Sequence, residues 1–154
     1  MSSPLAFAIG VRGPILSRAT ADETTTSDDF FGFEWLSDVA ESHIVIGAQF
    51  SPYDFCLLER TLPRLKIPRA AMDIERLANL EVFVDIIDPA WRTALASIAP
   101  ANVSKCADLW RAEFEKEEDD PPAWSHDEAL VVVQALVSLC AVPSASELIM
   151  IWCL

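Results

Sequence analysis

The residues best suited to surface chemistry lie in an acidic segment, Glu113 to Asp120, which is followed by Trp124. Six of its eight residues are carboxylates, and Lys116 is its only base. Carboxylates pair with arginine and lysine, and tryptophan is a frequent anchor in protein interfaces. The segment therefore predicts a contact site for a cationic surface. The alternative is a solvated helix end and loop. The residues assigned to this site are Glu115, Glu117, Glu118, Asp119, Asp120 and Trp124.

A second acidic segment near the N-terminus adjoins a group of phenylalanines. It contains Asp22, Glu23, Asp28, Asp29, Phe30, Phe31 and Phe33. An acidic loop beside aromatic rings fits the polar rim and apolar centre of a protein interface. The alternative is a surface loop that leads into an amphipathic helix. From this segment we assign Asp28, Asp29 and Phe31 to the partner-binding surface.

Ser125, His126 and Asp127 have the residue types of a hydrolytic triad, with His43 elsewhere in the chain. Neighbours along a chain rarely reach triad geometry, however, and no Gly-x-Ser-x-Gly elbow is present. Ser125 followed three residues later by Glu128 is typical of a capping box at a helix start. We therefore expect a helix here and expect that the protein is not an enzyme.

Metal and cofactor sites are not predicted either. The four cysteines are separated by 50, 34 and 13 residues, whereas a zinc or redox motif needs a pair only a few residues apart. Only two histidines and four glycines are present, which disfavours a transition-metal site or a phosphate-binding loop. We expect no cofactor, and cysteines that are reduced.

The elements that must position the acidic segments are mostly helical by pattern. Ser51-Pro52 and Asp88-Pro89 each read as an N-cap followed by proline at the first helical position. Val103, Cys106, Trp110 and Phe114 recur at helical spacing, and residues 126–141 are apolar nearly all round. The latter helix is expected at the centre of the fold. Further helices are expected over residues 29–41 and after Pro68, although Val82, Val84 and Ile86 also alternate like a strand.

These patterns predict a mainly α fold, a compact bundle of about six helices in a single domain over residues 1–154. Residues 51–141 form the expected helical core, and residues 1–30 are expected to be an irregular N-terminal segment. A minor β element is expected from residues 5–11 and 44–48 together with a C-terminal strand at residues 147–154.

The net charge restricts the partners. Eleven basic and 24 acidic residues give a formal charge of −13, with a pI near 4.3. Such a protein repels nucleic acids and anionic membranes and attracts basic proteins. No export signal and no apolar run of about 20 residues is evident, so we expect a soluble protein in the cytoplasm.

In its length, its charge of −13, its acidic segment and its Trp152-Cys153-Leu154 ending, the chain resembles the immunity proteins of bacterial toxin systems. The likeness is one of overall profile. It implies a tight one-to-one complex in which the protein covers the active site of a basic toxin or effector domain. Two alternatives stay open: a small enzyme or accessory subunit with a dispersed site, and an assembly protein that oligomerises through its apolar last helix.

Overall fold

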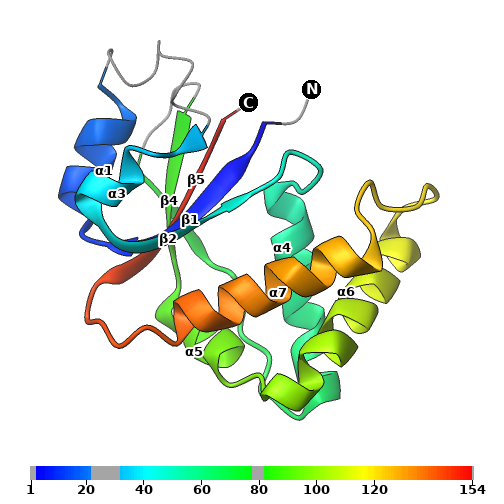
Figure 1. Cartoon of the computed structure of the whole chain (residues 1–154). Coiled ribbons are helices and arrows are strands. Elements are labelled where there is room, and N and C mark those ends of the chain that lie inside the picture. The colour runs from blue at the N-terminus through cyan, green and yellow to red at the C-terminus, as the bar shows by residue number, and fades with distance from the viewer. Residues whose placement is uncertain (1–2, 22–31, 78–81, 154) are drawn as a thin grey trace.

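A five-stranded antiparallel sheet lies at the centre of the computed structural model, which describes residues 3–21, 32–77 and 82–153 (Figure 1). The strand order is β2-β1-β5-β4-β3, so the first and last strands of the chain are neighbours. The strands are β1 (Leu5–Gly10), β2 (Ala40–Ile46), β3 (Ile74–Arg76), β4 (Val82–Ile87) and β5 (Glu147–Cys153).

The three central strands are largely apolar on both faces, apart from the buried Asp85 of β4, because helices cover the sheet on both sides. Along β1, Leu5, Phe7 and Ile9 face one hydrophobic cluster, while Ala6 and Ala8 face another. Successive side chains of a strand point to opposite faces, so this alternation follows from strand geometry. All six residues of β1 and all six of β4 are buried.

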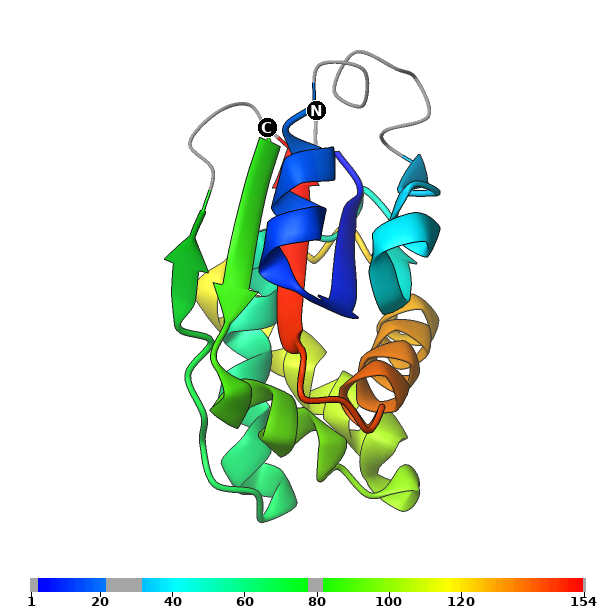
Figure 2. The ribbon, with the colours of Figure 1, turned by 90° about the vertical axis from the view of Figure 1, so that its left-hand side faces the viewer.

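One face of the sheet carries a thin layer made of α1 (Arg12–Ala19) and the short α3 (Leu36–Val39). Figure 2 shows α1 lying in front of the strands. Ile15 and Ala19 of α1, with Leu36 of α3, pack against the even-numbered residues of β1 and β4.

The other face carries the larger layer, which holds most of the core. It consists of α4 (Pro52–Leu58), the 3-10 helix η2 (Glu59–Leu65), α5 (Pro89–Ala96), the 3-10 turn η3 (Pro100–Asn102), α6 (Val103–Glu117) and α7 (His126–Cys140). The predicted helix starts are confirmed: Asp88 caps α5 with Pro89 behind it, and Ser125 and Glu128 form a capping box at α7. A capping box also opens α4, at Ser51 and Asp54.

The prediction of a mainly α fold with a minor β element is wrong, because the five-stranded sheet makes this an α+β fold. Within the described part of that stretch, the helix expected after Pro68 is absent: Ile74–Arg76 is a strand, and Val82–Ile87 pairs with both β3 and β5. The helix expected over residues 29–41 is reduced to Leu36–Val39 within its described part, and β2 begins at Ala40. The N-terminal region, expected to be irregular, contains α1.

Candidate functional site

The acidic segment forms the last turns of α6 and the start of the loop that leads to α7. Residues 115–120 are all exposed, whereas Glu113 is buried at 7% exposure. The carboxylates assigned to the partner-binding surface from this segment are therefore all accessible. They lie at the end of α6 beside the first turn of α7 (Figure 1).

The acidic segment has a part whose carboxylates form ion pairs and a part whose carboxylates do not. Lys116 Nζ lies 2.8 Å from Glu113, Arg111 Nε lies 3.2 Å from Glu115, and Arg60 Nη1 of η2 lies 2.6 Å from Glu117. The last three carboxylates, Glu118, Asp119 and Asp120, have no ion pair with any base in the described part of the chain. Within this segment, the uncompensated negative charge therefore lies in the loop rather than on the helix.

Trp124 is not an exposed anchor. Its side chain is only 2% exposed and stacks on Phe50 at a ring-centroid distance of 5.2 Å, with Trp110 4.9 Å away and Phe114 at 5.8 Å. Arg111 donates a 3.3 Å hydrogen bond to the Trp124 carbonyl. Trp124 thus fixes the acidic loop to the core, and the indole is unavailable to a partner.

The second predicted contact region lies mostly outside the described residues. Asp28, Asp29 and Phe31 lie outside the described residues, as do the other members of that segment up to Phe30. Phe33 is described and is completely buried beside Trp35 on the α1 side of the sheet. Phe33 therefore belongs to the core.

Ser125, His126 and Asp127 do not form a triad in this structure. The Ser125 hydroxyl accepts the backbone N–H of Glu128 at 3.2 Å, as a helix cap does. His126 Nε2 lies 2.6 Å from Asp108 Oδ1 of α6, while Asp127 is almost fully exposed. The histidine therefore links α6 to α7, and the serine is occupied by the cap.

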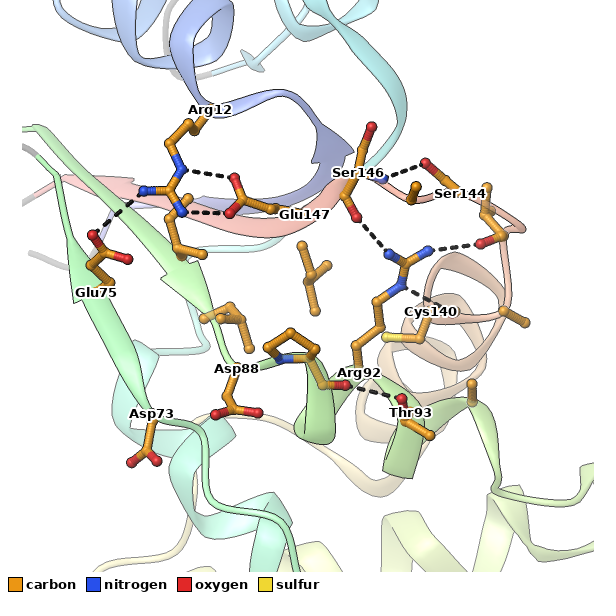
Figure 3. A pocket seen from close by; sticks show the side chains of 18 of the residues that line it. Arg12, Asp73, Glu75, Asp88, Arg92, Thr93, Cys140, Ser144, Ser146 and Glu147 are labelled. Atoms are coloured by element: carbon orange, nitrogen blue, oxygen red, sulfur yellow. Dashed lines mark hydrogen bonds and ion pairs between the residues drawn. The ribbon is translucent and has the colours of Figure 1, made fainter.

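A pocket of about 840 Å³, which the sequence patterns did not reveal, lies at one end of the sheet (Figure 3). β1 and β4 end there, and β3 and β5 begin there, because neighbouring strands are antiparallel. This topology brings together residues from four distant parts of the chain: Arg12 after β1, Asp73 before β3, Asp88 after β4 and Glu147 at the start of β5. α5 and the chain after α7 complete the wall.

Arg12 is held at this pocket by two carboxylates. Its Nε donates to Glu147 Oε2 at 2.9 Å, its Nη2 donates to the other oxygen of Glu147, and its Nη1 lies 3.4 Å from Glu75. The hydrogen bond from Arg12 lowers the pKa of Glu147 below its usual value. The pair ties the start of α1 to the start of β5.

Arg92 of α5 fixes the opposite wall. Its three nitrogens donate to the backbone carbonyls of Cys140, Val142 and Ser146, at 3.3, 2.7 and 2.8 Å. One guanidinium thereby satisfies acceptors at the end of α7 and in the connection to β5, where a helix leaves carbonyls without partners. Hydrogen bonds from Ser144 and Ser146, aided by the charge of Arg92, lower the pKa of the nearby Glu41.

The thiols offer little nucleophilic chemistry. Burial raises the pKa of Cys140, which lines the pocket, to about 12, and it also raises the pKa of Cys56 and of Cys106. A thiolate is the reactive form of cysteine, so these thiols are poorly prepared to attack a substrate at neutral pH. In the described part of the chain, no three side chains of the metal-ligating types converge on one point.

Comparison with protein-family models, with curated proteins and with solved structures finds no significant match to this chain. Among the residues described here, no helix combines the length and the apolar character that crossing a bilayer requires.

Proposed function

We propose that this protein is a non-enzymatic acidic binding protein that neutralises a basic toxin or effector by covering its active site, as an immunity-type inhibitor. The observation that carries the proposal is the exposed trio Glu118, Asp119 and Asp120, whose charge no base in the described part of the chain offsets. Unpaired surface carboxylates raise the rate of association with a cationic surface.

Two features support a pre-organised contact surface. Trp124 is buried four residues after Asp120, and α6 and α7 are joined by the contact between Asp108 and His126. The loop is therefore held in the core at Trp124, and the two helices that it connects are joined to each other. A loop that is already ordered loses less conformational entropy when it binds.

The proposed partner is a protein with a basic active-site surface, and the proposed location is the cytoplasm. The net charge of −13 opposes binding to nucleic acids and to anionic lipid surfaces. The partner's basic groove would normally hold an anionic substrate. Carboxylates of this protein would mask the groove by taking the places of the substrate's negative charges.

The test is affinity capture from a lysate of the source organism at low and at high salt, read by mass spectrometry. Wild-type protein is compared with Glu118→Lys/Asp119→Lys, and with Glu34→Lys/Asp38→Lys as a control with the same charge change on exposed residues around α3. We expect one stoichiometric basic partner that the wild type and the control retain and the acidic-loop variant loses. We also expect the purified complex to lack the partner's own activity.

Two outcomes would overturn the proposal. One is the absence of any stable partner at either salt concentration. The other is a partner whose activity is unchanged in the complex. A partner retained equally by the acidic-loop variant would remove Glu118 and Asp119 from the contact surface.

The pocket favours a second candidate, a small enzyme or an accessory subunit. Its volume of about 840 Å³ falls in the range of small-molecule sites, and it is lined by both charged and apolar groups. A screen of metabolites for thermal stabilisation, followed by a turnover assay, separates this candidate from a binding protein.

A further inference from the structure

The pocket at the end of the sheet is negatively charged as well as large. Four carboxylates line it, those of Asp73, Glu75, Asp88 and Glu147, against the two guanidinium groups of Arg12 and Arg92. Four negative and two positive groups leave a net charge of −2. A pocket with this imbalance favours a cationic occupant.

The charge is distributed unevenly within the pocket. Arg12 is engaged by Glu147 and Glu75 on one side, so these three groups already satisfy one another. The nitrogens of Arg92 are directed at backbone carbonyls in the opposite wall. Both guanidinium groups already have hydrogen-bond acceptors within the protein, so the arginines are poorly placed to bind an anion.

Asp73 and Asp88 behave differently from the other two acids. Their backbones continue the β3–β4 ladder one step beyond the pairing of Ile74 with Ile87, because the Asp88 N–H donates to the Asp73 carbonyl at 3.1 Å. Asp88 Oδ1 caps α5 by accepting the N–H of Ala90 at 2.7 Å. Neither carboxylate forms an ion pair with a described base; Asp73 is exposed and Asp88 is half-buried. Like charges on paired positions of neighbouring chain segments repel each other.

We propose that this pocket binds an organic cation, a ligand with a guanidinium or ammonium group that Asp73 and Asp88 receive together. Figure 3 shows both carboxylates at the end of the pocket away from Arg12 and Glu147. A cation between them removes their repulsion and forms charge-assisted hydrogen bonds. Apolar lining residues contact the carbon chain of the ligand: Ile74, Pro89, Ala96, Val142 and Pro143.

Two sources could supply such a group, a free amine or a basic side chain of a protein partner. The first source lies beyond the proposed function, whereas the second rests on it. A titration with isolated probes tests the pocket without requiring the partner. The probes are agmatine, which carries a guanidinium and an ammonium group, and the capped peptide acetyl-Gly-Arg-Gly-amide.

The protein is titrated with each probe and binding is followed by amide chemical shifts and by calorimetry. We expect saturable binding, with the largest shifts at Asp73, Glu75, Asp88 and residues 141–147. Asp73→Asn/Asp88→Asn should weaken binding roughly tenfold or more, since it removes both charges, and asparagine still caps α5. The matched control, Glu34→Gln/Asp38→Asn, removes two charges elsewhere and should leave the affinity unchanged. N-butylurea, an uncharged probe, should not bind.

The outcomes separate the two sources. Binding of agmatine alone assigns the pocket to a free amine, and binding of the peptide with similar or higher affinity shows that a partner's side chain can enter. No saturable binding of either probe overturns the proposal, as does equal affinity for the double asparagine variant. Failure of the lysate capture would count against the inhibitor function and would leave these titrations unaffected.

Discussion

The indole N–H of Trp110 in α6 donates a 2.6 Å hydrogen bond to the backbone carbonyl of Asp54 in α4. The Asp54 carboxylate itself is only 3% exposed and accepts the N–H of Ser51 at 2.7 Å, which caps α4. Trp110 also packs against Trp124, at the base of the acidic loop. This contact therefore connects the start of α4 to the helix whose end carries the acidic segment.

The buried Asp54 should make the protein more stable at mildly acidic pH. Burial raises the pKa of Asp54 above its usual value, even though hydrogen bonds from Ser51 oppose the shift. The pKa of an aspartate in the unfolded chain is about 3.9. At pH values between this pKa and the higher folded pKa, the folded state binds more protons than the unfolded state, so the free energy of unfolding falls as the pH rises. Relative to Asp54→Asn, the wild type should gain stability as the pH falls from about 7 toward about 4. Urea unfolding at several pH values measures this difference. A difference that does not change with pH would contradict it.

Glu147 should show the opposite dependence. Its folded pKa is lowered, chiefly by the hydrogen bond from Arg12. The pKa of a glutamate in the unfolded chain is about 4.3. The stabilisation from Glu147 is therefore present above that pH and is lost as the pH falls through the lowered pKa of the folded state. Relative to Glu147→Gln, the wild type should lose stability as the pH falls. The same unfolding series checks this. A wild type that does not lose stability relative to Glu147→Gln as the pH falls would contradict the prediction.

Trp124→Ala should destabilise the protein by about 3–5 kcal/mol, the usual cost of removing a buried aromatic side chain. The reason is its stacking on Phe50 and Trp110 in the core. Tyr53→Ala is the control, because Tyr53 is 47% exposed, and its effect should stay below about 1 kcal/mol. Urea unfolding measures both. Equal effects of the two changes would show that Trp124 is a surface residue.

Arg92→Met should destabilise the protein by about 2–4 kcal/mol, because it leaves three backbone carbonyls in the α7–β5 connection without their donor. Arg92→Lys should recover only part of this loss, since an ammonium group cannot reproduce the planar fork. Arg18→Met is the control: Arg18 makes one exposed ion pair of 3.5 Å with Asp38, worth less than about 1 kcal/mol. An Arg92→Met variant as stable as Arg18→Met would refute this role.

Charge reversal in the acidic loop should slow the association of the protein with its captured partner. Glu118→Lys/Asp119→Lys should lower the association rate roughly tenfold or more and weaken its dependence on salt. Surface plasmon resonance at several salt concentrations measures both quantities. The thermal stability of the variant should match that of the wild type, because neither side chain makes a described ion pair. An unchanged rate and salt dependence would exclude this loop from the encounter.

Helix starts and the exposed acidic segment were predictable because their signals are local. Ser51, Asp88 and Ser125 precede helices, as their capping patterns predict. The sheet was underestimated because its pairings are not local: β1 and β5 bring Ala6 opposite Ile151, and nothing near either residue specifies the other. The alternation of Val82, Val84 and Ile86 pointed to a strand, but it did not reveal which strands would flank it.

The sequence by itself determined the strong negative charge, the caps and the position of the exposed carboxylates, since these depend on composition and on residues a few positions apart. Only the tertiary structure decided that Trp124 is buried and that Asp73 meets Asp88 at a pocket. The physical reason is that burial and pocket formation depend on which distant segments pack together. Antiparallel pairing collects the ends of β1 and β4 and the starts of β3 and β5 at one end of the sheet, and that convergence creates the pocket.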